Sequence, residues 1–180
     1  MIRVDRKHIT EFLSEVLIET KLSVPGTHWA REVVFDCGTT DVKRLDFLHF
    51  VPENQMSVAG LEHGSFTAYE IKSCKADFES GFGKNAEGDT NFFVTTAKAW
   101  GDVKENFSKR YGSEWSVLVA VPKRFSPRSK KVIDWILDPD DTPMDDPGKW
   151  RLERIFDGRP ASRKRSLAEL LFVMMRAKRN

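Results

Sequence analysis

The stretch that most constrains the fold of this chain is residues 65–73, a run of strand-forming residues that ends in two charges. Phe66, Tyr69 and Ile71 favour a buried β-strand. Because strand side chains alternate between the two faces, Glu70 and Lys72 should point to one side while Ile71 points into the core. The pattern therefore predicts a carboxylate and an ammonium group side by side at the end of a buried strand.

A second carboxylate lies on the preceding apolar run, residues 45–51, where Asp46 follows Leu45. If the two runs are neighbours in a sheet, Asp46 and Glu70 come close enough to share a divalent metal. The alternative is a buried salt-bridge network that includes Lys72. Burying three charges for stability alone is unfavourable, because desolvation usually cancels the attraction. The set therefore favours a metal site.

The tripeptide acid-x-Lys is not specific by itself, because it occurs five times in this charge-rich chain. The other four copies begin at Asp5, Glu19, Asp41 and Asp102. Those copies fall in an exposed end, on helices or in a turn. Only the copy that begins at Glu70 ends a run of strand-forming residues and follows another acid-bearing apolar strand.

Length and composition predict one soluble globular domain, residues 1–180, with a core at about 5–122 and a basic C-terminal extension at about 123–180. Charged residues make up 31% and hydrophobic residues 40%. We expect no membrane span, because no apolar run is long enough, and no signal peptide. The two cysteines, Cys37 and Cys74, fit neither a disulfide framework nor a zinc site. We therefore expect a cytoplasmic protein.

The distribution of charge is more informative than the net charge of +2. Residues 151–180 contain nine Lys or Arg and three acidic residues, so the rest of the chain is net acidic. A basic end could bind phosphates. A solvated helix and tail explain the same charges equally well.

The expected elements form an α/β fold in which helices pack on a mixed sheet. We expect helices at about 5–21, 76–80, 97–111 and 166–178. Strands are expected at 32–35, 45–51, 65–73, 91–95 and 115–121, with an edge strand at 150–156. Residues 132–137 could be a strand or a helical turn, and residues 52–64 a polar connection. The glycine-rich residues 81–88 lack the Gly-Lys-Ser/Thr ending of a nucleotide-binding loop.

An Asp on one strand followed by Glu-x-Lys on the next resembles the PD-(D/E)XK nuclease superfamily. The string Glu70-Ile71-Lys72-Ser73-Cys74-Lys75-Ala76-Asp77-Phe78 is similar to its MmcB-like branch, whose members are linked to DNA repair and phages. Residues 83–85 and 88–95 resemble the phage-type proteins. One departure is Leu45, where the superfamily has proline. The resemblance implies a restriction-endonuclease-like core: a helix, a three-strand meander, and then helix, strand, helix and strand.

The resemblance implies that Asp46, Glu70 and Lys72 are catalytic. Asp46, Glu70 and the main-chain carbonyl of Ile71 would bind Mg²⁺, for which Mn²⁺ would substitute. Lys72 would orient or deprotonate the attacking water. Glu32 is the candidate for a further catalytic and metal-binding carboxylate, with Glu11 and Glu15 as rivals. Four polar residues near the site could contact DNA, although for each alone an ordinary surface role is the simpler explanation: Lys75, Lys84, Asn85 and Lys98.

We therefore expect a Mg²⁺-dependent nuclease that hydrolyses DNA in repair or in phage DNA processing. DNA would be its partner, and a homodimer is possible. The alternatives are a nucleic-acid-binding module that keeps the fold without turnover, and a structural subunit of a larger complex. The residues do not decide between DNA and RNA, or between endonuclease and exonuclease action. Trp100 and Trp115 are expected in the core rather than as base-stacking platforms.

Overall fold

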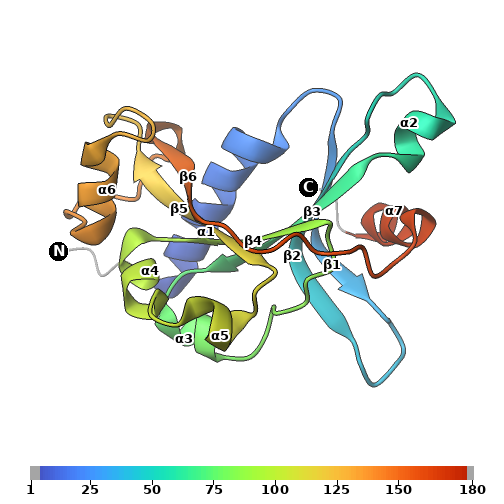
Figure 1. The fold of residues 1–180 in the computed structure, drawn as a ribbon, viewed down its shortest axis with the longest axis horizontal. Helices are drawn as coiled ribbons and strands as arrows, with labels where there is room; N and C mark the ends of the chain where they lie inside the picture. Colours follow the sequence, from blue (N-terminus) through green and yellow to red (C-terminus); the bar gives the residue numbers. More distant parts are fainter. Residues whose placement is uncertain (1–4, 178–180) are drawn as a thin grey trace.

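The computed structural model describes residues 5–177, in which six strands form one mixed sheet with helices packed on it (Figure 1). The strands lie in the order of the chain: β1 (His28–Phe35), β2 (Lys43–Val51), β3 (Ser65–Lys72), β4 (Thr90–Thr95), β5 (Trp115–Pro122) and β6 (Trp150–Phe156). β1, β2 and β3 form an antiparallel meander. β3, β4 and β5 are parallel, and β6 pairs antiparallel with β5. The predicted mixed sheet is confirmed.

The helices are α1 (Arg6–Leu17), α2 (Val58–Glu62), α3 (Lys75–Glu79), α4 (Ala97–Val103), α5 (Phe107–Tyr111), α6 (Lys130–Leu137) and α7 (Leu167–Arg176). α1 ends in a π-helical turn (Ile18–Leu22) and packs against β3, β4 and β6. In its apolar stripe, Phe12, Leu13, Val16 and Leu17 are buried in the larger hydrophobic core, and Ile9 is partly buried against it. α7 packs against β1 and closes a second core over the meander.

The predicted helix at 97–111 is interrupted, and the interruption has a local cause. α4 ends at Val103, and Asn106, the N-cap residue of α5, adopts a left-handed conformation with φ of 57°. Asn tolerates this conformation better than most residues. The apolar side is nevertheless continuous, because the rings of Trp100 and Phe107 lie 5.3 Å apart in an edge-on contact. Trp115 is 1% exposed, so its expected place in the core is confirmed.

Two other segments contain helices that the sequence pattern did not clearly indicate. The connection at 52–64 contains α2, whose first turn is capped by Ser57 as it accepts a hydrogen bond from Gly60 N at 3.0 Å. Residues 132–137, which could have been a strand or a helical turn, belong to α6. The expected closing helix is α7, and its last predicted residue, Lys178, lies outside the described residues.

The basic C-terminal extension is attached to the core by ion pairs. Between β6 and α7 the chain runs back across the molecule (Figure 1). On this return path, Arg163 pairs with Asp89 at 3.1 Å and donates to the carbonyl of Gly64 at 2.8 Å. Arg165 contacts three carboxylates, those of Asp36, Glu87 and Glu169. These two arginines therefore hold the fold together rather than presenting their charge for phosphate binding.

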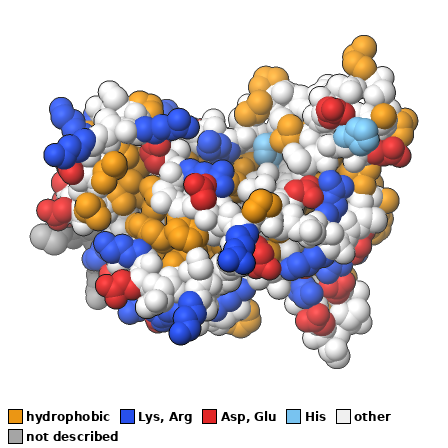
Figure 2. Space-filling view, in the orientation of Figure 1, with side chains coloured by type: hydrophobic (Ala, Val, Ile, Leu, Met, Phe, Trp, Pro, Cys, Tyr) orange, Lys and Arg blue, Asp and Glu red, His pale blue; other side chains and the backbone are white. Residues whose placement is uncertain are grey.

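A shallow apolar groove of about 380 Å³ lies between α4, α6 and β6. Ile133 and Leu137 of α6 line it, and both are more than half exposed. Figure 2 shows hydrophobic side chains gathered over the part of the surface where α4 and α6 lie. This groove is separate from the charged pocket described next, because the two share no lining residue.

Candidate functional site

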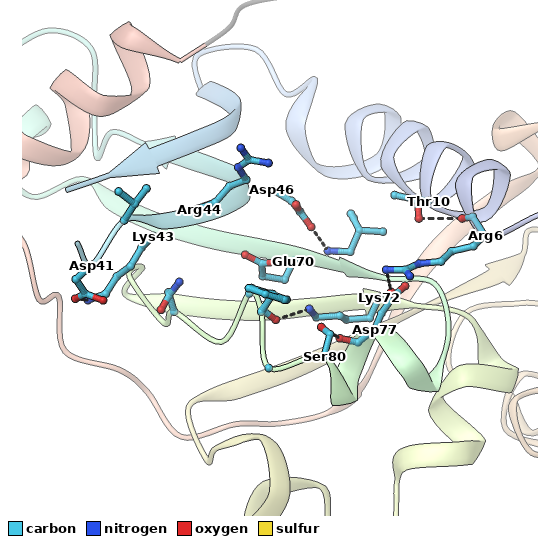
Figure 3. Close-up of a pocket in the computed structure, with 16 residues that line it drawn as sticks. Arg6, Thr10, Asp41, Lys43, Arg44, Asp46, Glu70, Lys72, Asp77 and Ser80 are labelled. Atoms are coloured by element: carbon cyan, nitrogen blue, oxygen red, sulfur yellow. Dashed lines mark hydrogen bonds and ion pairs between the residues drawn. The ribbon is translucent and has the colours of Figure 1, made fainter. Parts of the chain in front are cut away.

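A larger pocket of about 850 Å³ brings together Asp46, Glu70 and Lys72 (Figure 3). Its walls come from the start of α1, the start of β2, the end of β3, and the loop that follows α3. The two carboxylates and the ammonium group come from separate points of the sequence and line the same cavity. They do not lie on opposite sides of the sheet.

The pairing of β2 with β3 explains how Asp46 reaches this pocket. The antiparallel ladder between the strands ends at the pair Phe47 and Tyr69, one step before Asp46 and Glu70. Beyond that pair, β3 continues only against β4. Asp46 Oδ2 accepts a hydrogen bond from Ile71 N at 2.8 Å, so its side chain occupies the place of a ladder partner. This bond fixes the carboxylate beside the end of β3.

Glu70 is the most perturbed acid of the site. It is 4% exposed, and its Oε1 has no hydrogen-bond partner among the described residues. Burial, followed by repulsion from Asp46, raises the pKa of Glu70 to about 9. Burial also raises the pKa of Asp46, although the hydrogen bond from Ile71 opposes the change. In both groups burial is the largest cause of the raised pKa, and the positive charge of Lys72 opposes it.

Lys72 is fixed at the other side of Glu70. Its Nζ donates a hydrogen bond to the carbonyl oxygen of Phe82 at 2.8 Å and lies 5.7 Å from the centre of the Phe93 ring. Burial lowers the pKa of the Lys72 ammonium, and the negative charge of Glu70 opposes that shift. A lysine with a lowered pKa can exchange a proton more readily near neutral pH.

The donor set fits a hard cation such as Mg²⁺. The orphaned oxygen of Glu70 points to a missing positive partner in a buried position. Within residues 5–177, no group of three or more His, Cys, Asp or Glu residues is placed to hold a metal. Two carboxylates and a carbonyl suit Mg²⁺, which keeps several waters and needs few protein ligands. The same set does not suit a structural zinc ion.

The proposed fourth carboxylates lie elsewhere. Glu32 falls opposite Asp46 in the register of β1 and β2, but it is exposed, has a φ of 51° and does not line the pocket. Glu11 and Glu15 are exposed on α1 and do not line it either. Glu11 lies 3.8 Å from the ammonium group of Lys7. A role for Glu32 therefore stays a prediction, with no geometry of the pocket to support it.

The four predicted DNA contacts are only partly near the pocket. Asn85 lines it, whereas Lys75, Lys84 and Lys98 do not. Lys75 lies 3.9 Å from Glu79 on α3, and Lys98 is exposed on α4. Lys84 lies over the ring of Tyr111, at 5.3 Å, and its charge contributes to the lowered pKa of Lys72. Asn85 is therefore the one of the four with a direct place at the site.

Sequence reasoning missed several residues that shape the pocket. Arg6, at the start of α1, lines it and is anchored by an ion pair with the buried Asp77. Asp77 also accepts a hydrogen bond from Ser73 N at 3.0 Å, which fixes the turn after β3. Phe82 and Gly83 form the wall over Glu70 and Lys72. For Phe82 and Gly83, the sequence Gly-Phe-Gly shortly after β3 was a usable signal. Arg6 gave no signal, because it is far from Glu70 and Lys72 in the sequence.

The pKa of Glu70 predicts how the stability of the metal-free protein depends on pH. Its folded-state pKa of about 9 lies above the ordinary glutamate pKa of 4.5, so the folded protein binds more protons between these values. Stability should therefore fall as the pH rises through this window. We expect Glu70→Gln to be more stable than the parent at pH 9, by roughly 1–3 kcal/mol, and similar at pH 4.5.

Urea unfolding of both proteins in EDTA across this range measures the difference. Lys72 is present in both proteins, and its lowered pKa makes stability rise with pH, which is opposite to the effect of Glu70. Parallel pH profiles for the two proteins would show that Glu70 is ionised at neutral pH without a metal.

Gly83 provides a second test of the site. Its φ is +66°, and a Cβ atom there would overlap Oε2 of Glu70 and lie 3.0 Å from Nζ of Lys72. Gly81, with φ of +79°, has nothing within 4 Å of its Cβ position. Alanine at either position should cost about 1–2 kcal/mol of stability from the left-handed backbone. Only Gly83→Ala should weaken Mn²⁺ binding, by about tenfold or more.

Isothermal titration of the two variants with Mn²⁺ makes this comparison. Equal Mn²⁺ affinity in both would mean that the carboxylate of Glu70 does not need the space that Gly83 leaves.

The candidate site is described by the positions of its own side chains. Within residues 5–177, no helix has the length and apolar character needed to cross a membrane. In comparisons with known proteins, no family model, no curated protein and no solved structure matches this chain.

Proposed function

We propose that this protein is a metal-dependent deoxyribonuclease of the PD-(D/E)XK type, with a restriction-endonuclease-like core. The observation that carries the proposal is the meeting of Asp46, Glu70 and Lys72 in one pocket. The meander β1–β2–β3 with β4 and β5 parallel to β3, and α1 packed against the sheet, is consistent with such a core. DNA repair and phage DNA processing are the biological settings that the sequence resemblance suggests.

Asp46, Glu70 and the carbonyl of Ile71 are the groups that would hold Mg²⁺. When bound, the ion would supply positive charge to an anionic phosphodiester and acidify a water molecule. The protein's own contribution is to fix these groups before the substrate arrives. The hydrogen bond from Ile71 N holds Asp46, and the packing of Gly83 against Glu70 leaves the carboxylate little freedom.

Lys72 would act on the water and on the phosphate. Its hydrogen bond to Phe82 O holds the ammonium group at the pocket wall, beside Glu70. In its protonated form it can donate to a phosphoryl oxygen. Because burial lowers the pKa of Lys72, its neutral form is also accessible for accepting a proton from the attacking water.

Cationic side chains at the pocket could contact the phosphates on either side of the cleaved bond. Arg6, Lys43 and Arg44 line the pocket, and Arg6 and Arg44 are exposed. They approach from α1 and from the start of β2, so they surround the carboxylates from two directions (Figure 3). A basic rim over an acidic centre suits a polyanionic substrate that must bind close to carboxylates.

The direct test is incubation of the protein with plasmid, linear duplex and single-stranded DNA in Mg²⁺ or Mn²⁺. We expect metal-dependent cleavage of at least one substrate, with loss of cleavage in EDTA and in Lys72→Met. If no DNA is cut while the protein still binds both Mn²⁺ and DNA, a nucleic-acid-binding module that keeps the fold without turnover becomes the better account. RNA cleavage in place of DNA cleavage would change the substrate class.

A further inference from the structure

Phe82 has an unusual position at the charged pocket. Its side chain is 80% exposed, whereas most of the phenylalanines of the described chain are buried or half-buried. It lies between Gly81 and Gly83, which both have positive φ values. Its backbone is held at the site, because its carbonyl oxygen accepts the hydrogen bond from Lys72. An aromatic ring thus projects into solvent from a backbone that is fixed at the candidate catalytic lysine.

We propose that Phe82 stacks on an unpaired base next to the cleaved phosphate, so that the substrate is DNA that is single-stranded or opened at that point. This inference rests on the proposed nuclease function. Aromatic rings that project beside a cationic groove bind single-stranded nucleic acid by stacking on bases. Bases in an intact duplex are stacked on each other and are not available to such a ring.

The surroundings of Phe82 fit this role. Phe82 lines the pocket, as do the cations Arg6 and Arg44, so a base on its ring would leave the adjoining phosphates near the charged cavity. Within the described chain, the ring of Phe82 contacts no other aromatic ring and has no cation over its face. The rings of Phe78 and Phe93, by contrast, contact each other, and Lys72 lies over the ring of Phe93. Both flanking glycines have positive φ values, a conformation that glycine adopts without steric cost.

The test compares Phe82→Ala and Phe82→Trp with a matched control, Phe172→Ala. Phe172 is 55% exposed on α7, away from the pocket. Binding of fluorescein-labelled oligo(dT) and of a duplex of the same length is measured by anisotropy in Ca²⁺ or EDTA, so that no cleavage is required. Cleavage in Mn²⁺ is measured separately.

We expect Phe82→Ala to weaken oligo(dT) binding by about tenfold or more while duplex binding changes little. Phe82→Trp should retain binding, and Phe172→Ala should match the parent. Unchanged oligo(dT) binding in Phe82→Ala would overturn the inference, even if the metal-dependent cleavage is confirmed. Equal loss for single-stranded DNA and duplex would overturn it too, because the ring would then contact DNA without selecting unpaired bases. If the parent cuts no DNA, the nuclease proposal fails, while the binding comparison still decides the role of Phe82.

Discussion

Glu70→Gln and Asp46→Asn are each expected to slow metal-dependent DNA hydrolysis by about 1000-fold or more, equivalent to about 4 kcal/mol of transition-state stabilisation. The physical reason is the small number of donors. Of the four carboxylates of the described chain that line the pocket, Asp41 is paired with Lys43 and Asp77 with Arg6. Asp46 and Glu70 are the two left to hold a divalent ion, so the loss of either leaves too little negative charge. Initial rates of cleavage of a labelled DNA substrate in Mn²⁺ measure the effect.

A matched control separates loss of chemistry from loss of folding. Glu11→Gln removes an exposed carboxylate of α1 that does not line the pocket, and it should leave the cleavage rate within about twofold of the parent. Glu70→Gln should remain folded and gain stability at alkaline pH, because it removes a buried acid with a raised pKa. A Glu70→Gln protein that is folded and fully active would remove Glu70 from the mechanism.

Arg165→Met is expected to destabilise the protein by about 3 kcal/mol. The Arg165 side chain is 12% exposed and lies 2.8 Å from Glu87, whose side chain is 3% exposed. Without the guanidinium group, the nearest cation to Glu87 is Lys43, at 3.9 Å, which leaves a buried carboxylate weakly compensated. Arg165 also joins the C-terminal extension to Asp36 at the end of β1, so its loss should loosen the packing of α7.

Arg124→Met is the matched control for this measurement. Arg124 also pairs with a carboxylate, that of Asp140, but both side chains are about half exposed. Exposed pairs contribute less than about 1 kcal/mol, so urea unfolding should barely distinguish Arg124→Met from the parent. If both variants lose equal stability, the buried ion pairs of Arg165 do not hold the C-terminal extension.

The strands and the core were predictable from the sequence because their signals are local. Apolar runs of strand-forming residues bounded by turn residues place β2, β3 and β5, and the helical stripe places α1. The meeting of Asp46 with Glu70 could be anticipated because antiparallel neighbours along the chain usually pair in space. The break before Asn106 could not, because the apolar side continues across it and periodicity does not reveal a single residue with positive φ.

The parts of the pocket that were missed depend on contacts over long sequence distances. Arg6 reaches Asp77 only because α1 packs across the sheet, and no local pattern indicates that contact. The basic C-terminal residues could not be assigned from charge alone, because their function depends on which acids face them. In the folded molecule Arg163 pairs with Asp89, and Arg165 pairs with Glu87. Their positive charges are therefore compensated by acids of the core.

The most direct test of the account is the stoichiometry of Mn²⁺ binding to the purified protein, measured by isothermal titration with electron paramagnetic resonance as a second readout. We predict a Mn²⁺ site in the parent that is lost in both Asp46→Asn and Glu70→Gln and retained in Glu11→Gln. Glu32→Gln should bind Mn²⁺ as the parent does if its exposed position excludes it from the site. No Mn²⁺ binding by the parent, or equal binding by the Asp46 and Glu70 variants, would contradict the proposal that these two carboxylates form a metal site.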